Sequence, residues 1–581
     1  MNFQKDSIHL ARGLSLLLYI IPVTLTSAST TDTFPEEPPQ EPLPSRAPNA
    51  VETAIEAPQA AENLISEENL TALMEQNLGP DDDAGPPVIL SPQAAIDLAL
   101  KRNLGLAVTR YQPSISGDTL QIAESEFDPV ISSSVNANDR VSPQAATNLE
   151  GVAQGAQPRN SGQSGEFGVS QKIPTGATVT AGTEINRSTT NSNRSFLNPE
   201  YTTNATLSVR QPLLRDFGAK VNLAEIAKAR LALNQSRLAV RREVLDVIAA
   251  AEIRYWQLSA AKARKLLFDS NLELAENLLE ENQERERLGL ATRLDVLQAQ
   301  ASLAARSEDV ILAQQATENA EDRLRTVLGD LNYGIEASLE VEELPEINPP
   351  VPEFREAVRS ALAQDMDTQI QYEIIEQRKI DRSVARNRTL PTLDFTAGVG
   401  LLGLEGQPAD AYDKALRGNG YNWSTGLELS FPWGMRSARA QLSTRKKQVL
   451  QEETELAVIQ QELLLRLREA WRAVVAGKER TATTRASLVL NEESFVRERA
   501  RYDAGASSFR NVLEAQRDFD EAKIRHLDAM IDLIESTVSL SRLDGTILIR
   551  HGFEWEEIDS ETQTLPEPVE PLPVDNLGAP S

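Results

Sequence analysis

The sequence predicts a mixed α and β membrane protein built from two internal structural repeats. Three observations predict this fold: an internal repeat that relates the second half of the chain to the first, two very long stretches almost free of Gly and Pro, and short segments that alternate between apolar and polar side chains. In each repeat the alternating segments come first and the long stretches follow. We therefore expect β-strands to precede long helices in both halves.

The internal repeat is most evident near the ends of the long stretches. Residues 508–516 (SFRNVLEAQ) parallel residues 292–300 (TRLDVLQAQ) at an offset of 216. Two pairs of prolines continue the match towards the N-terminus: Pro212 with Pro432 at an offset of 220, and Pro129 with Pro391 at an offset of 262. Since 262 exceeds 216 by 46, the halves differ by an insertion in the region between these prolines and the long helices.

Two antiparallel helical hairpins are predicted by the long uninterrupted stretches. Residues 219–287 contain neither Gly nor Pro, and 435–504 contain only Gly477. At about 1.5 Å per residue each would form a rod of about 100 Å. A second uninterrupted stretch follows each rod after a glycine, at 290–328 and 506–544. A plain coiled-coil stalk would explain these segments equally well.

The alternating segments argue against a plain stalk. Their apolar and polar side chains alternate at residues 422–431, 202–210, 393–401 and 178–185. A β-barrel with an apolar outer face and a wet lumen needs strands of this kind, although a half-exposed soluble sheet would show the same pattern. Aromatic residues near the strand ends suit the two surfaces of a membrane: Tyr201, Tyr421, Trp423, Phe431 and Trp433.

The first half offers about four strand candidates where the second offers two. The additional pair meets at residues 173–177 (IPTGA), which have good turn chemistry. Two alternatives follow. Either the sheet has more strands than the repeat requires, or one pair forms outside the membrane.

The ends of the chain differ in composition from its body. Residues 1–28 have the order of a secretory signal peptide, with an uncleaved anchor as the alternative. We expect residues 29–90 to be a disordered linker rich in Pro and acids, and 554–581 to be a disordered acidic tail. The net charge is −28, and these two segments carry −12 and −8 of it. The remaining body is only mildly acidic, so a nucleic-acid partner is not supported.

Residue types needed for catalysis or cofactor binding are sparse. Cysteine is absent, which excludes disulfides, thiolate metal sites, cysteine nucleophiles and a lipidated N-terminal cysteine. The only histidines are His9, His526 and His551, and no phosphate-binding or zinc-protease motif occurs. We therefore expect no enzyme, no cofactor, no catalytic site and no metal site.

Four motifs together resemble the TolC-like outer-membrane efflux protein family, also called outer membrane factors. They are RYDAGASSFRNVLEAQ at 501–516, its twin ERLGLATRLDVLQAQ at 286–300, QPLLRDFG at 211–218 and FPWG at 431–434. The resemblance divides the body into a first repeat at 91–335, with strands at about 128–210 and long helices at 219–328. The second repeat spans 350–549, with strands at about 392–431 and long helices at 435–544.

The resemblance implies a homotrimer in the outer membrane of a Gram-negative bacterium, with a large periplasmic part. Its protomers would share a transmembrane β-barrel continued by a long periplasmic α-helical barrel. The implied function is the duct of a tripartite efflux or type I secretion system. It would passively export substrates handed over by an inner-membrane pump through a periplasmic adaptor. The alternative is a periplasm-spanning structural tether, anchored by a small β-barrel among outer-membrane lipids, that transports nothing.

The family also implies that the two hairpin turns dock the adaptor. The candidate docking residues are Gly289, Leu290, Thr292, Asp295 and Val296 in the first turn, and Gly505, Ala506, Ser508, Asn511 and Val512 in the second. Helix capping and hairpin packing would explain the same residue types. The turns are not identical, because Asn511 stands where its twin has Asp295, and Glu286 stands where the other has Tyr502.

Overall fold

The computed structural model describes residues 88–143, 157–329 and 338–555, which lie within one compact unit. The predicted signal peptide and nearly all of the predicted linker and tail lie outside the described residues. Residues Val88–Leu90, the end of the predicted disordered linker, form a short strand instead. Trp555, at the start of the predicted acidic tail, packs against the core. Both segments are therefore ordered where they meet the body of the protein.

The first half contains five strands and five α-helices within the described residues. In chain order they are β1 (Val88–Leu90), α3 (Pro92–Arg102), α4 (Leu104–Glu124), β2 (Val130–Val141), β3 (Arg159–Lys172), β4 (Thr178–Thr190), β5 (Glu200–Pro212), α5 (Ala219–Asn222), α6 (Ala224–Arg287) and α7 (Arg293–Leu328). The second half, within the described part of the chain, comprises β6 (Leu339–Val341), α8 (Phe354–Gln364), α9 (Met366–Asn387), β7 (Thr392–Glu405), α10 (Pro408–Leu416), β8 (Gly420–Ser430), α11 (Arg436–Asp503), α12 (Phe509–Leu543) and α13 (Ile547–Arg550).

The repeat is visible in the helices that precede each set of strands. The starts of α8 and α9 follow those of α3 and α4 at an offset of 262, which also relates the start of β7 to that of β2. The residue between each pair of helices caps the second helix in the same way. The side chain of Asn103 accepts a hydrogen bond from the N–H of Leu106 at 2.9 Å, and that of Asp365 accepts one from Thr368 at 2.8 Å. The same local chemistry therefore begins both halves.

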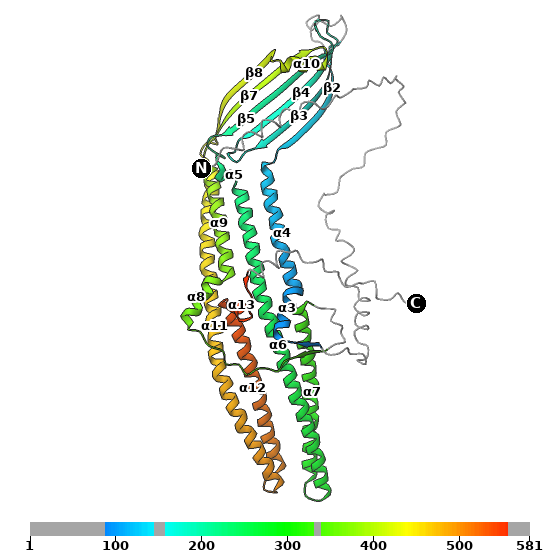
Figure 1. Cartoon of the computed structure of the whole chain (residues 1–581), viewed down its shortest axis with the longest axis vertical. Coiled ribbons are helices and arrows are strands. Elements are labelled where there is room, and N and C mark those ends of the chain that lie inside the picture. Colours follow the sequence, from blue (N-terminus) through cyan, green and yellow to red (C-terminus); the bar gives the residue numbers. More distant parts are fainter. Residues whose placement is uncertain (1–87, 144–156, 330–337, 556–581) are drawn as a thin grey trace, which may run out of the picture. The chain divides into compact units, whose positions relative to one another are not determined.

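Six strands form one antiparallel sheet in the order β2-β3-β4-β5-β7-β8 (Figure 1). The additional pair predicted in the first half, β3 and β4, belongs to this sheet. Its turn at 173–177 is closed by a hydrogen bond from the N–H of Ile173 to the carbonyl of Ala177 at 2.7 Å. Gly176 has a φ of 93° in this turn, a conformation that favours glycine. The ladder between β5 and β7 joins the two halves.

The two faces of the sheet have opposite chemistry, as the alternation predicted. The register places on one face, called the apolar face, side chains that include Val135, Phe167, Ile185, Leu207, Val399, Trp423 and Leu427. The other face, called the polar face, carries Asn136, Glu166, Glu184, Arg210, Asp394 and Glu428. Arg210 of β5 pairs with Asp394 of β7 at 2.5 Å, so an ion pair reinforces the junction of the halves on the polar face.

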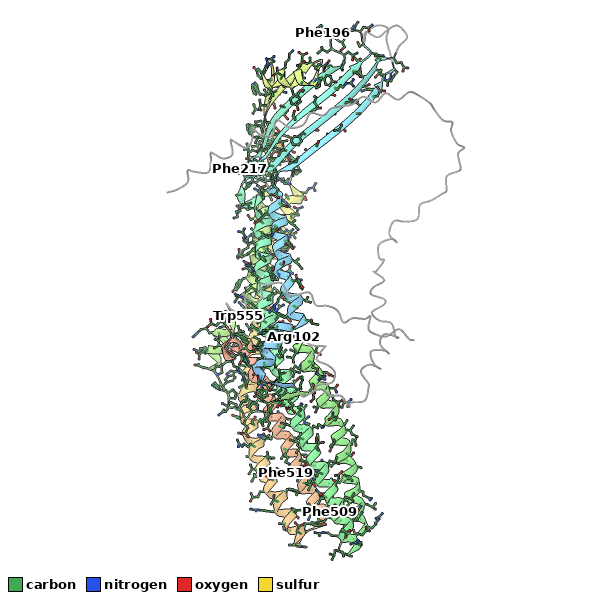
Figure 2. The ribbon with its side chains drawn as sticks, turned by 45° about the vertical axis from the view of Figure 1, so that its right-hand side comes forward. Arg102, Phe196, Phe217, Phe509, Phe519 and Trp555 are labelled. Carbon is green, nitrogen blue, oxygen red and sulfur yellow. The ribbon has the colours of Figure 1, made fainter. Side chains whose placement is uncertain are left out.

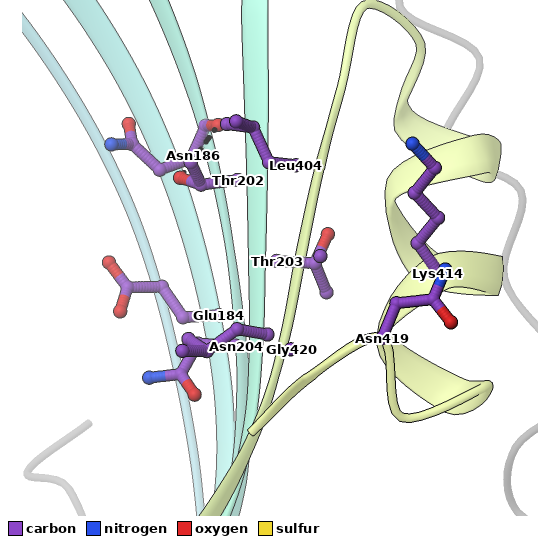
Figure 3. Close-up of a pocket in the computed structure, with 11 residues that line it drawn as sticks. Glu184, Asn186, Thr202, Thr203, Asn204, Leu404, Lys414, Asn419 and Gly420 are labelled. Atoms are coloured by element: carbon purple, nitrogen blue, oxygen red, sulfur yellow. Dashed lines mark hydrogen bonds between the residues drawn. The ribbon is translucent and has the colours of Figure 1, made fainter. Parts of the chain in front are cut away.

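Helix α10 lies in the connection between β7 and β8 and covers part of the apolar face. A Cβ at Gly403 would lie 1.8 Å from the carbonyl oxygen of Ala411, so only glycine permits this approach. The hydroxyl groups of Tyr412 and Thr183 are 2.8 Å apart. Figure 3 shows the neighbouring open pocket, where Glu184 points to the side of the sheet opposite Lys414 of α10.

The long helices connect the sheet to two hairpin turns at the other end of the unit (Figure 1). Helix α6 has 64 residues and α11 has 68, and α7 and α12 run back along them. Leu223 separates the short α5 from α6, the one break in the stretch predicted at 219–287. In α11, Gly477 lets α12 approach closely, because a Cβ there would lie 3.1 Å from Leu533 Cδ1. Within the described residues, no helix has both the length and the apolar character needed to cross a membrane.

The main hydrophobic core lies about midway along the helices. It combines side chains from α3, α6, α7, α12 and α13, including Ile96, Val244, Ile248, Leu324, Ile534 and Ile547. The parallel pair β1–β6 crosses this region. The fully buried Tyr255 ties the pair to α6, because its hydroxyl donates to the carbonyl of Leu90 and accepts from the N–H of Glu342, both at 2.8 Å. Leu90 and Glu342, far apart in the sequence, are thus bound to one helix.

We expect the substitution Tyr255→Phe to destabilise this region by about 2 kcal/mol, because two backbone groups lose their partner in a site that has little water. Thermal unfolding of the purified protein, followed by circular dichroism, should show a lower melting temperature. The matched control is Tyr372→Phe, since Tyr372 is 51% exposed on α9. Equal melting temperatures for the two variants would contradict the stabilising role assigned to the Tyr255 hydroxyl.

Candidate functional site

The first hairpin turn, called the first tip, joins α6 to α7 at residues 285–296. Gly289 has a φ of 73°, and the N–H of Leu290 donates back to the carbonyl of Arg285 at 2.7 Å. Helix α7 then begins with a capping box. The N–H of Asp295 donates to the Thr292 hydroxyl at 3.3 Å, and the N–H of Thr292 donates to the Asp295 carboxylate at 2.8 Å. The sequence therefore ends one helix and starts the next by local chemistry alone.

The second tip, residues 501–512, has the same path with different capping. Gly505 has a φ of 71°, and the N–H of Ala506 donates to the carbonyl of Arg501 at 2.8 Å. Ser508 makes no side-chain capping bond to α12. Asn511 donates instead to the Ser507 hydroxyl at 3.1 Å, so the exchange of Asp295 for Asn511 removes the capping box.

The predicted docking residues fall into three groups by exposure. Val296 and Val512 are buried, and they pack the hairpins rather than facing outward. The exposed members are Gly289, Leu290, Thr292, Gly505, Ala506, Ser508 and Asn511, whereas Asp295 is half-buried in its capping box. The exposed group and, in part, Asp295 present atoms that a partner could touch in this conformation.

The two tips differ in what they expose. The first tip carries four exposed leucines: Leu288, Leu290, Leu294 and Leu297, with exposed fractions of 66%, 74%, 62% and 49%. At the offset of 216, the second tip has Ala504, Ala506, Arg510 and Leu513 in these places. The first tip thus offers an apolar surface and the second a smaller and partly basic one. Figure 2 marks the second tip through Phe509, which is buried near the turn.

A buried tyrosine holds the two hairpins together close to the tips. Tyr502 of α11 packs with Phe509 and Val512 against Leu278 and Ala299 of the first hairpin. Its hydroxyl donates to the side-chain oxygen of the buried Asn282 at 3.2 Å. Burial raises the pKa of Tyr502, so its hydroxyl keeps the proton that this bond requires.

Charged side chains surround this tyrosine and join the hairpins a second time. The Glu281 carboxylate pairs with Arg285 of its own helix at 2.7 Å and with Arg499 of α11 at 2.5 Å. Arg499 also lies 3.4 Å from Asp503, and Arg285 lies over the Tyr502 ring at 4.4 Å. We call Glu281, Asn282, Arg285, Arg499, Tyr502 and Asp503 the tip network.

A second set of polar contacts stabilises the second tip internally. The Ser507 hydroxyl donates to the Glu498 carboxylate, and this hydrogen bond is the main reason why the pKa of Glu498 lies below its usual range. Arg501 pairs with the same carboxylate at 3.0 Å. Glu498 therefore stays ionised and fixes the turn against α11.

The sequence did not identify the tip network. One signal was present, because Tyr502 and Glu286 occupy equivalent places in the two repeats and so cannot have the same role. The rest could not be found locally, since Glu281 and Arg499 come from different hairpins and are 218 residues apart.

The predicted interfacial aromatics lie towards both ends of the sheet. Tyr421 and Trp423 are each 70% exposed near the start of β8, while Phe431 and Trp433 follow its end and lie 6.4 Å apart. Tyr201 lies opposite Glu405 at the end where β8 starts. Phe217 marks the opposite end, where the sheet meets the helices (Figure 2). About ten residues of β8 separate the two aromatic groups, the length of a tilted membrane-spanning strand.

Comparisons with known proteins agree with this architecture. A family model described as "Outer membrane efflux protein" matches residues 95–330 and 358–546. The chain is 23% identical over 353 residues to the protein named Outer membrane efflux protein BepC from Brucella suis biovar 1 (strain 1330), covering 60% of this chain and 73% of that protein.

Solved structures share the fold at low sequence identity. The outer-membrane channel OprN has a TM-score of 0.60 and 18% identity, covering 78% of this chain and 89% of that chain. The CmeC outer membrane channel of Campylobacter jejuni has the same score and identity, with 81% and 89% covered. The outer membrane protein VceC of Vibrio cholerae has a TM-score of 0.57 and 14% identity, with 78% and 96% covered.

We expect Arg499→Ala to loosen both tips, because Glu281 loses its partner on the other hairpin. A partly buried ion pair of about 1 kcal/mol corresponds to roughly a fivefold rise in local opening. Amide hydrogen exchange should accelerate in residues 278–300 and 498–515 and remain unchanged in the sheet. Arg497→Ala is the matched control, since Arg497 is exposed and pairs with Glu493 of its own helix. Equal exchange in both variants would count against the network.

Proposed function

The chain belongs to the outer membrane efflux protein family, as its motifs predicted, and on this premise we propose that it is the duct of a tripartite efflux or type I secretion system. It is an efflux channel located in the outer membrane of a Gram-negative bacterium. Its substrates would pass through it passively after an inner-membrane pump delivers them through a periplasmic adaptor. Members of this family are channels rather than enzymes.

The two-faced sheet is the observation that carries this proposal. Its apolar face suits contact with lipid, and its polar face, with Glu166, Glu184 and Arg210, suits a water-filled lumen. The exposed Trp423 and Trp433, towards opposite ends of β8, suit the two interfaces of a bilayer. A sheet of a soluble protein would instead bury its apolar face against its own core, whereas Leu427 and Leu429 are 68% and 60% exposed.

A homotrimer would complete the sheet. In the described structure β2 and β8 each have one neighbour, so both leave backbone groups without partners along one edge. Unpaired backbone groups are not tolerated in hydrocarbon, and a closed barrel formed with further copies removes both edges. The long hairpins would then extend from the barrel as an α-helical tunnel on the periplasmic side.

The tips would dock the periplasmic adaptor. They lie at the end of the unit away from the sheet, and the first tip exposes four leucines next to Gly289 (Figure 1). These leucines leave about half or more of their surface in water, and this surface would gain about 25 cal/mol for each Å² buried against a partner. The tip network would hold the tunnel narrow until the adaptor engages.

The duct and the structural tether differ in conductance. We expect the purified protein to conduct in planar lipid bilayers. Arg499→Ala should raise the open probability about fivefold, because the ion pair that is lost contributes about 1 kcal/mol to the closed state. Arg497→Ala should behave as the unmodified protein does. If the protein inserts but passes no current, even when Glu281 and Arg499 are both replaced by alanine, the tether becomes the better description.

Docking at the first tip can be tested by the double substitution Leu290→Glu and Leu294→Glu. Charges at these positions should lower adaptor cross-linking and export about tenfold or more, because they would have to be desolvated in the complex. Trimers in the outer membrane should be unaffected, since Leu290 and Leu294 are 74% and 62% exposed. Leu266→Glu is the control, because Leu266 is 71% exposed on α6 but remote from the tip. Export and cross-linking at normal levels would refute docking at this tip.

A further inference from the structure

The apolar face of the sheet carries charged side chains at one end only. Within the six strands this face holds four of them: Asp139, Arg159, Arg187 and Glu405. All four lie at the end away from the long helices, called the outer end, where β2, β4 and β7 finish and β3 begins. Phe196, between β4 and β5, marks this end in Figure 2. Charges on the lipid-facing side of a barrel are destabilising in mid-membrane and tolerated near its surface, so these residues mark where hydrocarbon would end.

Helix α10 indicates the same boundary. It packs on the outer end of the apolar face, against Gly403, and Thr203 points towards it and is only 1% exposed (Figure 3). The residues that α10 leaves exposed include four with a charge: Asp410, Asp413, Lys414 and Arg417. A helix with such an exposed surface suits the headgroup region rather than hydrocarbon. The outer end of the apolar face would therefore lie among lipid headgroups.

One row of side chains at the outer end has no partner in the described structure. Gln163 of β3 lies opposite Arg187 of β4, and Arg187 lies opposite Tyr201 of β5, so three adjacent strands place them side by side. With the residues that the structure describes, these three side chains make no hydrogen bond or ion pair. Gln163 is exposed, and Arg187 and Tyr201 are half-buried. The row is therefore accessible from outside the sheet.

Arg187 differs in this respect from the other charged residues of the outer end. Arg159 pairs with Asp139 at 2.7 Å, and Glu405 pairs with Lys414 of α10. Among the described residues, Arg187 is thus the one charge on the apolar face without a counter-ion. A cation next to hydrocarbon is costly unless an anion or water compensates it. The missing counter-ion would be supplied by whatever surrounds the sheet.

We propose that Gln163, Arg187 and Tyr201 bind the phosphate group of a lipid in the outer leaflet of the membrane. This inference rests on the proposed duct, which places the apolar face against lipid, and it adds a specific lipid site. Each of the three side chains carries a donor: an amide NH₂, a guanidinium and a hydroxyl. Phosphate oxygens are acceptors, and a guanidinium can donate to two of them at once.

The geometry of the row suits one phosphate group. Neighbouring strands lie about 4.8 Å apart, so the Cα atoms of Gln163 and Tyr201 are about 10 Å apart, with that of Arg187 between them. A phosphate held by the guanidinium would lie within reach of both neighbours. Tyr201 also has the amphipathic ring that is enriched at membrane surfaces.

The surface next to the row favours a lipid over a soluble anion. Towards the long helices, the same face continues with Ile185 on β4 and with Phe167 on β3, which is 44% exposed. The acyl chains of a lipid whose phosphate binds Arg187 would lie along these side chains. A soluble anion would use the three donors and leave the apolar surface uncovered. The continuity of donors and apolar side chains therefore points to one molecule that has both chemistries.

Native mass spectrometry of the full-length protein, released from nonionic detergent micelles that contain phosphatidylglycerol, tests the site. We expect one retained lipid for each copy of the chain. Arg187→Gln should lower the ratio of lipid-bound to free protein about tenfold, because a charge-assisted contact is lost. Arg187→Lys, which keeps the charge without the planar fork, should have an intermediate effect. The matched control is Arg159→Gln, since Arg159 lies at the same end of the apolar face and already pairs with Asp139.

Tyr201→Phe tests the hydroxyl independently of the charge. It keeps the ring and removes one donor, so it should lower the ratio about threefold. This variant separates phosphate binding from aromatic anchoring, and it keeps the test decisive if Arg187→Gln fails to fold.

Two further probes identify the ligand. Diacylglycerol, which lacks the phosphate, should not be retained, and inorganic phosphate should not displace phosphatidylglycerol at the same concentration. Equal lipid retention by Arg187→Gln and Arg159→Gln would overturn the inference, as would retention of diacylglycerol. Displacement by inorganic phosphate would also overturn it and would identify a site for small anions.

Conductance of the unmodified protein in planar bilayers reports on the proposed function separately. Conducting trimers that show none of the expected lipid differences reject only the lipid site. Absence of both trimers and conductance rejects the duct as well.

Discussion

The ladder of backbone hydrogen bonds that runs from β2 to β8 is the interaction on which the rest of this molecule depends. Hydrocarbon offers no partner to a free N–H or carbonyl group, so a membrane sheet must pair every strand on both sides. In the proposed barrel the β5–β7 ladder meets this requirement between the two halves, and the ion pair between Arg210 and Asp394 reinforces that ladder. On the proposed trimer, the same requirement makes a single copy incomplete, because β2 and β8 are the edges of the described sheet.

The long helices fix the position of the tips relative to the sheet. Helices α6 and α11 lead from the sheet to the tips, α6 after the short α5, and contain no Pro and only Gly477, so the chain between sheet and tip is stiff. The core around Tyr255 fastens both hairpins halfway along, and the tip network fastens them again near the turns. Between these two regions, Arg264 of α6 pairs with Asp528 of α12 and Arg306 of α7 pairs with the buried Asp520 of α12. The hairpins are therefore joined along their length.

Much of this fold could be predicted from the sequence because its signals are local. Gly289 and Thr292 define where one helix ends and the next begins, and the structure places those boundaries within a few residues of the prediction. Strand β1 was missed because three residues acquire their structure by pairing with Leu339–Val341, far along the chain. Helix α10 was missed because its nine residues lie in a connection between strands and are held by packing against Gly403 of β7, which leaves no local signal. Pairings between Glu281 and Arg499, or Tyr502 and Asn282, depend on how the hairpins pack and have no periodic signal.

The insertion in the first half shows what such a sheet can tolerate. The β3–β4 hairpin adds two strands, so β2 and β5 keep opposite directions and α6 still leaves the sheet at the end where α4 enters it. A single added strand would reverse one of them and send the long helix to the wrong side. The hairpin also preserves the faces, because the row from Val130 through Ser170 and Thr180 to Ser208 stays on the polar side. Strands in a membrane sheet of this design can therefore be gained only in pairs, and each pair must conserve the alternation of the strands that it separates.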